Sequence, residues 1–92
     1  MSVATAELAN ALGVRESDLL QEALRSLLLE KKREVLRTKL EILSRYSATS
    51  LGDLETKITN GDVAEHPAWE DLIVAENLNT RLGELDDYLR RL

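Results

Sequence analysis

The feature that most constrains this chain is an uninterrupted run from Asp18 to Tyr46 that contains neither glycine nor proline. Leu, Glu, Lys, Arg and Ala dominate the run, and these residues all have high helix propensity. The segment therefore predicts one helix of roughly eight turns, with Ser17 as a suitable N-cap residue. A helix of this length is usually stabilised by packing against several other elements.

Apolar residues of this long helix fall on two sides when they are placed at about 100° per residue. The first side is broad and carries Leu20, Ala23, Leu24, Leu27, Leu28, Val35 and Ile42. The second side carries Leu29, Leu36, Leu40 and Leu43. One stripe is enough to dock a helix on a single neighbour. Two stripes favour contact with two elements, one in the same chain and one in a second copy, although a small monomer could wrap both sides.

Two short helices are predicted on either side of the long one, at about residues 5–12 and 50–60. The first is expected to end at Gly13, because glycine tolerates the left-handed conformation that often terminates a helix. The second begins at Ser50 followed three residues later by Asp53, which approximates a capping box.

The last predicted helix covers residues 67–91 and starts at Pro67, whose missing N–H would be unpaired in a first turn anyway. Its apolar residues step four and three apart and form an a/d seam at Ala75, Leu78, Leu82, Leu85, Leu89 and Leu92. The clear repeat is shorter than a coiled coil requires, and antiparallel packing in a helical bundle explains it as well.

These elements predict an all-α fold in one domain, residues 1–92, with four helices in the order short, long, short, long. The helices at about 17–46 and 67–91 form the body, the helix at 50–60 bridges them, and homodimerisation through the long helix completes the bundle. Residues 1–46 carry eight Lys/Arg and seven Asp/Glu, whereas the acidic C-terminal portion, residues 47–92, carries four and ten. Such an acidic portion favours either a basic protein partner or plain solubility over contact with nucleic acid.

The residue inventory argues against catalysis. The chain has no Cys and one His, which excludes a thiolate nucleophile and any site that needs two imidazoles. We expect His66 to be a connector or capping residue, and we expect the adjacent carboxylates Glu70 and Asp71 to lie on solvated faces. No enzymatic activity, catalytic residue, cofactor or metal site is therefore predicted. No apolar run or leader suggests a membrane span or export, so we expect a cytoplasmic protein without membrane contact.

A DNA-binding regulator is the alternative function. The segment 6–14 followed by the long helix is similar to a helix-turn-helix unit, and the stretch 15–25 looks like the second-helix start of ribbon-helix-helix regulators. Glu16 and Asp18 would face phosphates unfavourably in such a unit. The neighbouring basic cluster is interleaved with glutamates, which favours an ion-paired helix face. The candidate DNA contacts are Arg15, Gln21, Lys31 and Lys32.

The only Trp lies at the start of the last helix. Trp69 could anchor a partner, since Trp contributes strongly to interfaces. It could instead pack with Leu72 and Ile73 to pin the last helix onto the long one, which is favoured in a chain without Phe. Trp69 can serve both roles if the hydrophobic core is shared between the two chains of a dimer. The candidate dimer or partner interface is Leu29, Leu36, Leu40, Leu43, Trp69, Leu72, Ile73, Leu78, Leu82, Leu85 and Leu89.

Four segments follow one another in a distinctive order: ELANALGV, the long Leu/Arg/Glu helix ending in Ser-Arg-Tyr-Ser, SLGDLE, and EHPAWEDLIVAENL. Together they resemble a group of small, all-helical, functionally uncharacterised prokaryotic proteins that are often encoded beside a candidate toxin gene and interpreted as its antitoxin. The resemblance covers nearly the whole chain, and the Trp-Glu-Asp helix start is its most specific part. It implies a non-enzymatic protein that neutralises a partner, such as a basic toxin, and represses its own promoter.

Overall fold

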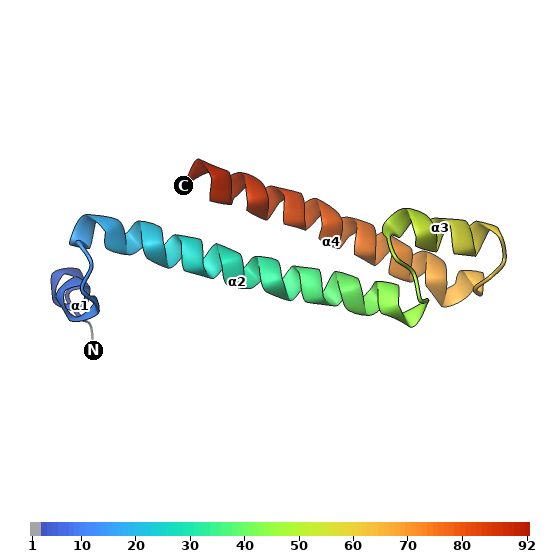
Figure 1. The fold of residues 1–92 in the computed structure, drawn as a ribbon, viewed down its shortest axis with the longest axis horizontal. Coiled ribbons are helices and arrows are strands. Elements are labelled where there is room, and N and C mark those ends of the chain that lie inside the picture. Colours follow the sequence, from blue (N-terminus) through green and yellow to red (C-terminus); the bar gives the residue numbers. More distant parts are fainter. Residues whose placement is uncertain (1–2) are drawn as a thin grey trace.

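The computed structural model describes residues 3–92, and within that range it consists of four helices and no strands (Figure 1). The helices are α1 (Thr5–Leu12), α2 (Glu16–Arg45), α3 (Leu51–Thr59) and α4 (Glu65–Arg91). The prediction of an all-α chain with alternating short and long helices is confirmed. The two long helices form an antiparallel hairpin, with α3 beside its turn and α1 at the opposite end (Figure 1).

Most helix ends follow the local signals in the sequence. Gly13 adopts a left-handed conformation with φ 70° and ends α1. Ser50 Oγ accepts a hydrogen bond from the Asp53 N–H at 3.0 Å and caps α3. The expected N-cap role of Ser17 is wrong. The extended residue Arg15 precedes the helix, which places Ser17 inside its first turn.

The best-buried part of the molecule lies at the α3 end. Leu43 of α2, Leu54 and Ile58 of α3, and Ala68 and Leu72 of α4 form one cluster, each at most 4% exposed. The two α3 residues share a face because they are one helical turn apart. Helix α3 therefore bridges the two long helices as predicted, packing mainly on α4 and reaching α2 through Leu43.

The predicted seam of α4 faces α2 along the hairpin. Its members are buried or half-buried at Ala75, Leu78, Leu82, Leu85, Leu89 and Leu92. Two polar contacts cross between the helices beside this seam: Lys32 Nζ lies 2.7 Å from Asp86 Oδ1, and Lys39 Nζ donates to Asn79 Oδ1 at 2.9 Å. These contacts are consistent with one antiparallel register along most of the hairpin.

The start of α4 differs from the favoured prediction. Leu72 joins the core cluster, but Trp69 and Ile73 are 38% and 55% exposed. Trp69 and Ile73 are one helical turn apart, so they share a side of α4 that is rotated away from Leu72. The expectation that all three residues pin α4 onto α2 is therefore wrong for Trp69 and Ile73.

The molecule is far more extended than a globular chain of its length. Its extents are 60 × 27 × 17 Å and its radius of gyration is 19.3 Å. A compact chain of this length would have a radius of gyration of about 12 Å. Most of the hairpin is therefore only two helices thick and leaves much of its apolar surface uncovered.

Candidate interaction surfaces

The predicted interface residues separate into two groups in the structure. One group packs within the chain and comprises Leu43, Leu72, Leu78, Leu82, Leu85 and Leu89. The other group is exposed and comprises Leu29, Leu36, Leu40, Trp69 and Ile73. The exposed group alone offers side chains to a partner without rearrangement of the hairpin.

The three leucines of the exposed group form a stripe on α2. Leu29, Leu36 and Leu40, which we call the α2 stripe, are 40%, 39% and 53% exposed. Arg33, Arg37 and Glu41 border the shallow groove that contains Leu36 and Leu40. The stripe is therefore an apolar strip with charged edges of both signs.

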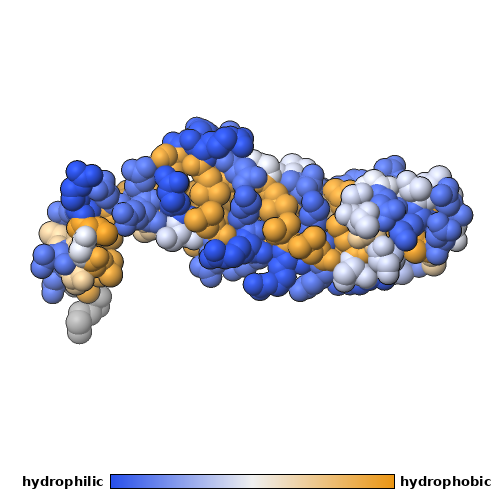
Figure 2. Space-filling model, in the orientation of Figure 1, coloured by the Kyte–Doolittle hydropathy of each residue, from blue (hydrophilic) through white to orange (hydrophobic). Residues whose placement is uncertain are grey.

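A second apolar surface was missed by the sequence analysis and lies between the start of α2 and the end of α4. The groove is lined by Leu24, Leu27, Leu28, Tyr88, Arg91 and Leu92, and Leu20 borders an adjoining hollow. We call these seven residues the end groove. Leu20, Leu27 and Tyr88 are 69%, 51% and 55% exposed. Figure 2 shows hydrophobic residues exposed along the hairpin and on α1, between hydrophilic residues.

The end groove lies where the last turns of α4 meet the start of α2. The backbone oxygen of Leu92 accepts a hydrogen bond from Gln21 Nε2 at 2.8 Å, which places Leu92 beside the second turn of α2. Leu20, Leu24 and Leu27 step four and three residues apart, as a packing helix requires. That spacing is a signal in the sequence, but it does not show which of these residues α4 covers.

The four candidate DNA contacts all bond within the chain. Gln21 donates to the Leu92 carbonyl, and the ion pairs are Arg15 Nε–Asp18 Oδ2 at 2.7 Å, Lys31 Nζ–Glu34 Oε2 at 3.6 Å and Lys32 Nζ–Asp86 Oδ1 at 2.7 Å. Such exposed pairs add little to stability. They nevertheless place a carboxylate beside each cation, which weakens the attraction for phosphates on which DNA binding depends. No described contact specifically favours the DNA alternative.

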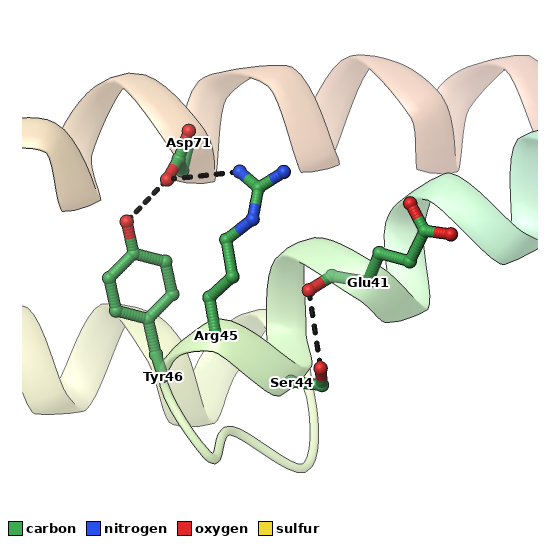
Figure 3. Close-up of polar contacts among 5 residues, drawn as sticks. All are labelled: Glu41, Ser44, Arg45, Tyr46 and Asp71. Carbon is green, nitrogen blue, oxygen red and sulfur yellow. Dashed lines mark hydrogen bonds and ion pairs between the residues drawn. The ribbon is translucent and has the colours of Figure 1, made fainter.

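A polar contact joins the end of α2 to the start of α4 (Figure 3). The Tyr46 hydroxyl donates to Asp71 Oδ2, and Arg45 Nη1 lies 3.6 Å from the same oxygen. The hydrogen bond to Asp71, followed by partial burial, raises the pKa of Tyr46 to about 12. The expectation that Asp71 lies on a solvated face is wrong, because its side chain is 20% exposed and is engaged by both residues.

His66 takes a local role at the start of α4. Its Nδ1 lies 2.7 Å from Glu70 Oε1 in an exposed position. The pKa of Glu70 is lowered, first by a hydrogen bond that the Glu70 carboxylate accepts from the Glu70 backbone N–H and then by the contact with His66. Within residues 3–92 the structure groups no His, Asp and Glu side chains into a metal-binding cluster.

Charge is strongly segregated along the hairpin. Residues 47–79, which include α3 and the first half of α4, carry seven Asp/Glu and one Lys, a net charge of −6. The remaining residues have a net charge of +1. We call residues 47–79 the acidic half. In the described part of the chain, no helix has the length and apolar character that a bilayer span requires.

Comparison with known proteins gives one match. The model of a family described as "Uncharacterized protein MJ0235 family" matches residues 1–92. Neither the curated proteins nor the solved structures contain a match. The family description names no activity, so the function has to be argued from the surfaces of the molecule.

Proposed function

The chain belongs to the uncharacterised MJ0235 protein family, and we propose that it is a non-enzymatic interaction protein whose open helical hairpin binds a protein partner. The exposure of apolar side chains carries this proposal. Among residues 3–92, thirteen large hydrophobic side chains are exposed, whereas nine hydrophobic residues are buried. Contiguous exposed apolar surface commonly marks a site of protein–protein contact.

The accessible surface area supports the same conclusion. The chain exposes 6661 Å². A globular monomer of 10.3 kDa would expose about 5,400 Å². The excess of about 1,300 Å² is comparable to the surface that one partner loses in a stable protein–protein interface, about 800 Å² or more.

The acidic half gives the proposed partner its chemistry. A net charge of −6 on residues 47–79 attracts a basic protein surface and accelerates encounter with it. Trp69 and Ile73 are exposed on α4 in the same half, and an exposed Trp flanked by an aliphatic side chain can anchor the contact. Neutralisation of a basic toxin, the antitoxin-like role that the sequence resemblance implies, is the specific form of this proposal.

Co-expression with the products of the adjacent genes tests the proposal. We expect one of them to co-purify, with an affinity that falls as salt is raised because the contact is electrostatically steered. Trp69→Ala is expected to weaken the complex at least about tenfold. Leu36→Ala is a matched control, since Leu36 is 39% exposed against 38% for Trp69 but lies outside the acidic half.

Two outcomes contradict the proposal. The antitoxin-like form is wrong if neither adjacent product binds. The assignment of the contact to the acidic half is wrong if Leu36→Ala weakens the complex as much as Trp69→Ala does.

A further inference from the structure

We propose that the end groove is covered by a second copy of this chain, in a two-fold dimer whose protomers overlap at their α1 ends. The inference rests on the proposed function, because the second copy is one of the proteins that cover the exposed apolar surface of the hairpin. It differs from the dimer predicted from the sequence, which formed through the long helix and whose candidate interface contained none of the end-groove residues.

The exposed area is sufficient for such a dimer. Each chain exposes about 1,300 Å² more than a globular monomer of its mass. A standard interface removes about 800 Å² from each partner. A dimer contact of standard size would therefore remove about 800 Å² of this excess from each chain and leave about 500 Å² for a second partner.

The distribution of exposed apolar residues selects the α1 end. More than half of them lie there, namely Val3, Leu8, Leu12, Leu20, Leu24, Leu27 and Tyr88. Helix α1 packs against α2 and leaves Leu8 and Leu12 42% and 60% exposed. A two-fold interface uses the same patch on both copies, so a patch at one end places the symmetry axis at that end.

The charge distribution favours the same arrangement. Each acidic half has a net charge of −6, whereas the rest of the chain has a net charge of +1. Overlap at the α1 ends brings nearly neutral surfaces together and holds the two acidic halves at opposite ends of the dimer. A parallel side-by-side pair would instead place the acidic halves next to each other, where like charges repel.

A pair of double substitutions tests the location of the contact. Leu24→Glu with Leu27→Glu adds charge to the end groove, at residues that are 40% and 51% exposed. Leu36→Glu with Leu40→Glu makes the same change in the α2 stripe, at residues that are 39% and 53% exposed.

Analytical ultracentrifugation of the full chain at about 100 µM is expected to show a dimer for the wild type and for the α2-stripe variant. The end-groove variant is expected to be a monomer, with a dimer dissociation constant raised at least about a hundredfold. Circular dichroism checks that both variants stay helical.

Distances between spin labels test the geometry. The chain has no native Cys, so single labels can be placed at Ser26→Cys in α2 or at Thr59→Cys in α3. We expect the two labels at position 26 to lie much closer together than those at position 59, which should be separated by more than the 60 Å length of one chain.

Three results would overturn the inference: a wild-type monomer at about 100 µM, a dimer broken in the α2-stripe variant but not in the end-groove variant, or labels at position 59 closer together than those at position 26. The proposed function fails separately. A monomer that still binds a basic partner refutes the dimer alone, and a dimer that binds neither adjacent product refutes the partner alone.

Discussion

The hydrogen bond between Tyr46 and Asp71 predicts a stability difference that depends on pH. Tyr46→Phe removes the hydroxyl that donates to Asp71 and keeps the ring, which packs against the core cluster. The shift in the pKa of Tyr46 from 10.0 to about 12 sets an upper limit of about 2.7 kcal/mol on the contribution of the neutral hydroxyl. Since Tyr46 is only partly buried, solvent screening reduces this value, and we expect about 1 kcal/mol.

The sign of the pH dependence follows from the direction of the shift. The folded-state pKa of Tyr46 lies above the value of 10.0 expected in the unfolded chain, so unfolding releases a proton between the two values. The stabilisation by the hydroxyl is therefore complete below about pH 10 and is lost as the pH rises towards about 12. All other side chains are the same in both proteins, so the difference between wild type and Tyr46→Phe isolates the tyrosine.

Urea denaturation followed by far-UV circular dichroism measures this difference. We expect Tyr46→Phe to lower the free energy of unfolding by about 1 kcal/mol at pH 8, and the gap to narrow steadily above about pH 10. Tyr88→Phe is the matched control at a protein concentration low enough to keep the chain monomeric, because the Tyr88 ring is then 55% exposed and its hydroxyl should contribute less than about 0.5 kcal/mol. A gap that stays constant up to about pH 11.5, or that is equally large for Tyr88→Phe, would refute the assigned role of the hydrogen bond.

The remaining predictions concern stability and use the same urea assay. Leu54→Ala should cost about 2–5 kcal/mol because Leu54 is 0% exposed, whereas Ile73→Ala, at 55% exposure, should cost less than about 1 kcal/mol; similar costs would mean that α3 does not pack as described. Ser50→Ala should cost about 1 kcal/mol because it removes the hydroxyl that accepts the Asp53 N–H, and an unchanged midpoint would contradict that cap. Gly83→Ala should add about 0.5–1 kcal/mol, since it lies inside α4 and an added Cβ would meet nothing within 4 Å; a loss of stability would indicate a contact at this position.

Features set by local chemistry were predictable from the sequence. The end of α1 at Gly13 depends on a left-handed residue, and the start of α3 depends on a side chain that reaches only three positions along the chain. The α4 seam was predictable because a stripe that repeats every three and four residues has to be buried against another helix. The start of α2 was missed by one residue because Ser17 is a good cap by type, but the extended backbone of Arg15 begins the helix before it.

Features set by the relation between distant segments were not predictable. Leu20, Leu24 and Leu27 look like core residues in the sequence, but the structure leaves them 69%, 40% and 51% exposed where the end of α4 meets the start of α2. Which residues of α2 are covered by α4 depends on the register between the two helices, and no single segment encodes that register. At the start of α4, Trp69 and Leu72 are both apolar and are neighbours on the helix surface, so the sequence pattern does not separate them. The packing of α2 and α3 against α4 buries Leu72 and leaves Trp69 38% exposed.

Burial along the hairpin also explains how the two proposed contacts can act independently. The core cluster and the Tyr46–Asp71 hydrogen bond hold the α3 end together within one chain, whereas the α1 end has an open groove and a short helix that packs mainly on α2. A second copy seated on the end groove would therefore add stability where the chain has least of it, because binding to the folded state alone raises its stability. The acidic halves remain uncovered at the two ends of such a dimer, with Trp69 exposed in each. The two inferences together thus require a complex of two chains with two basic partners, in which one partner does not block the site of the other.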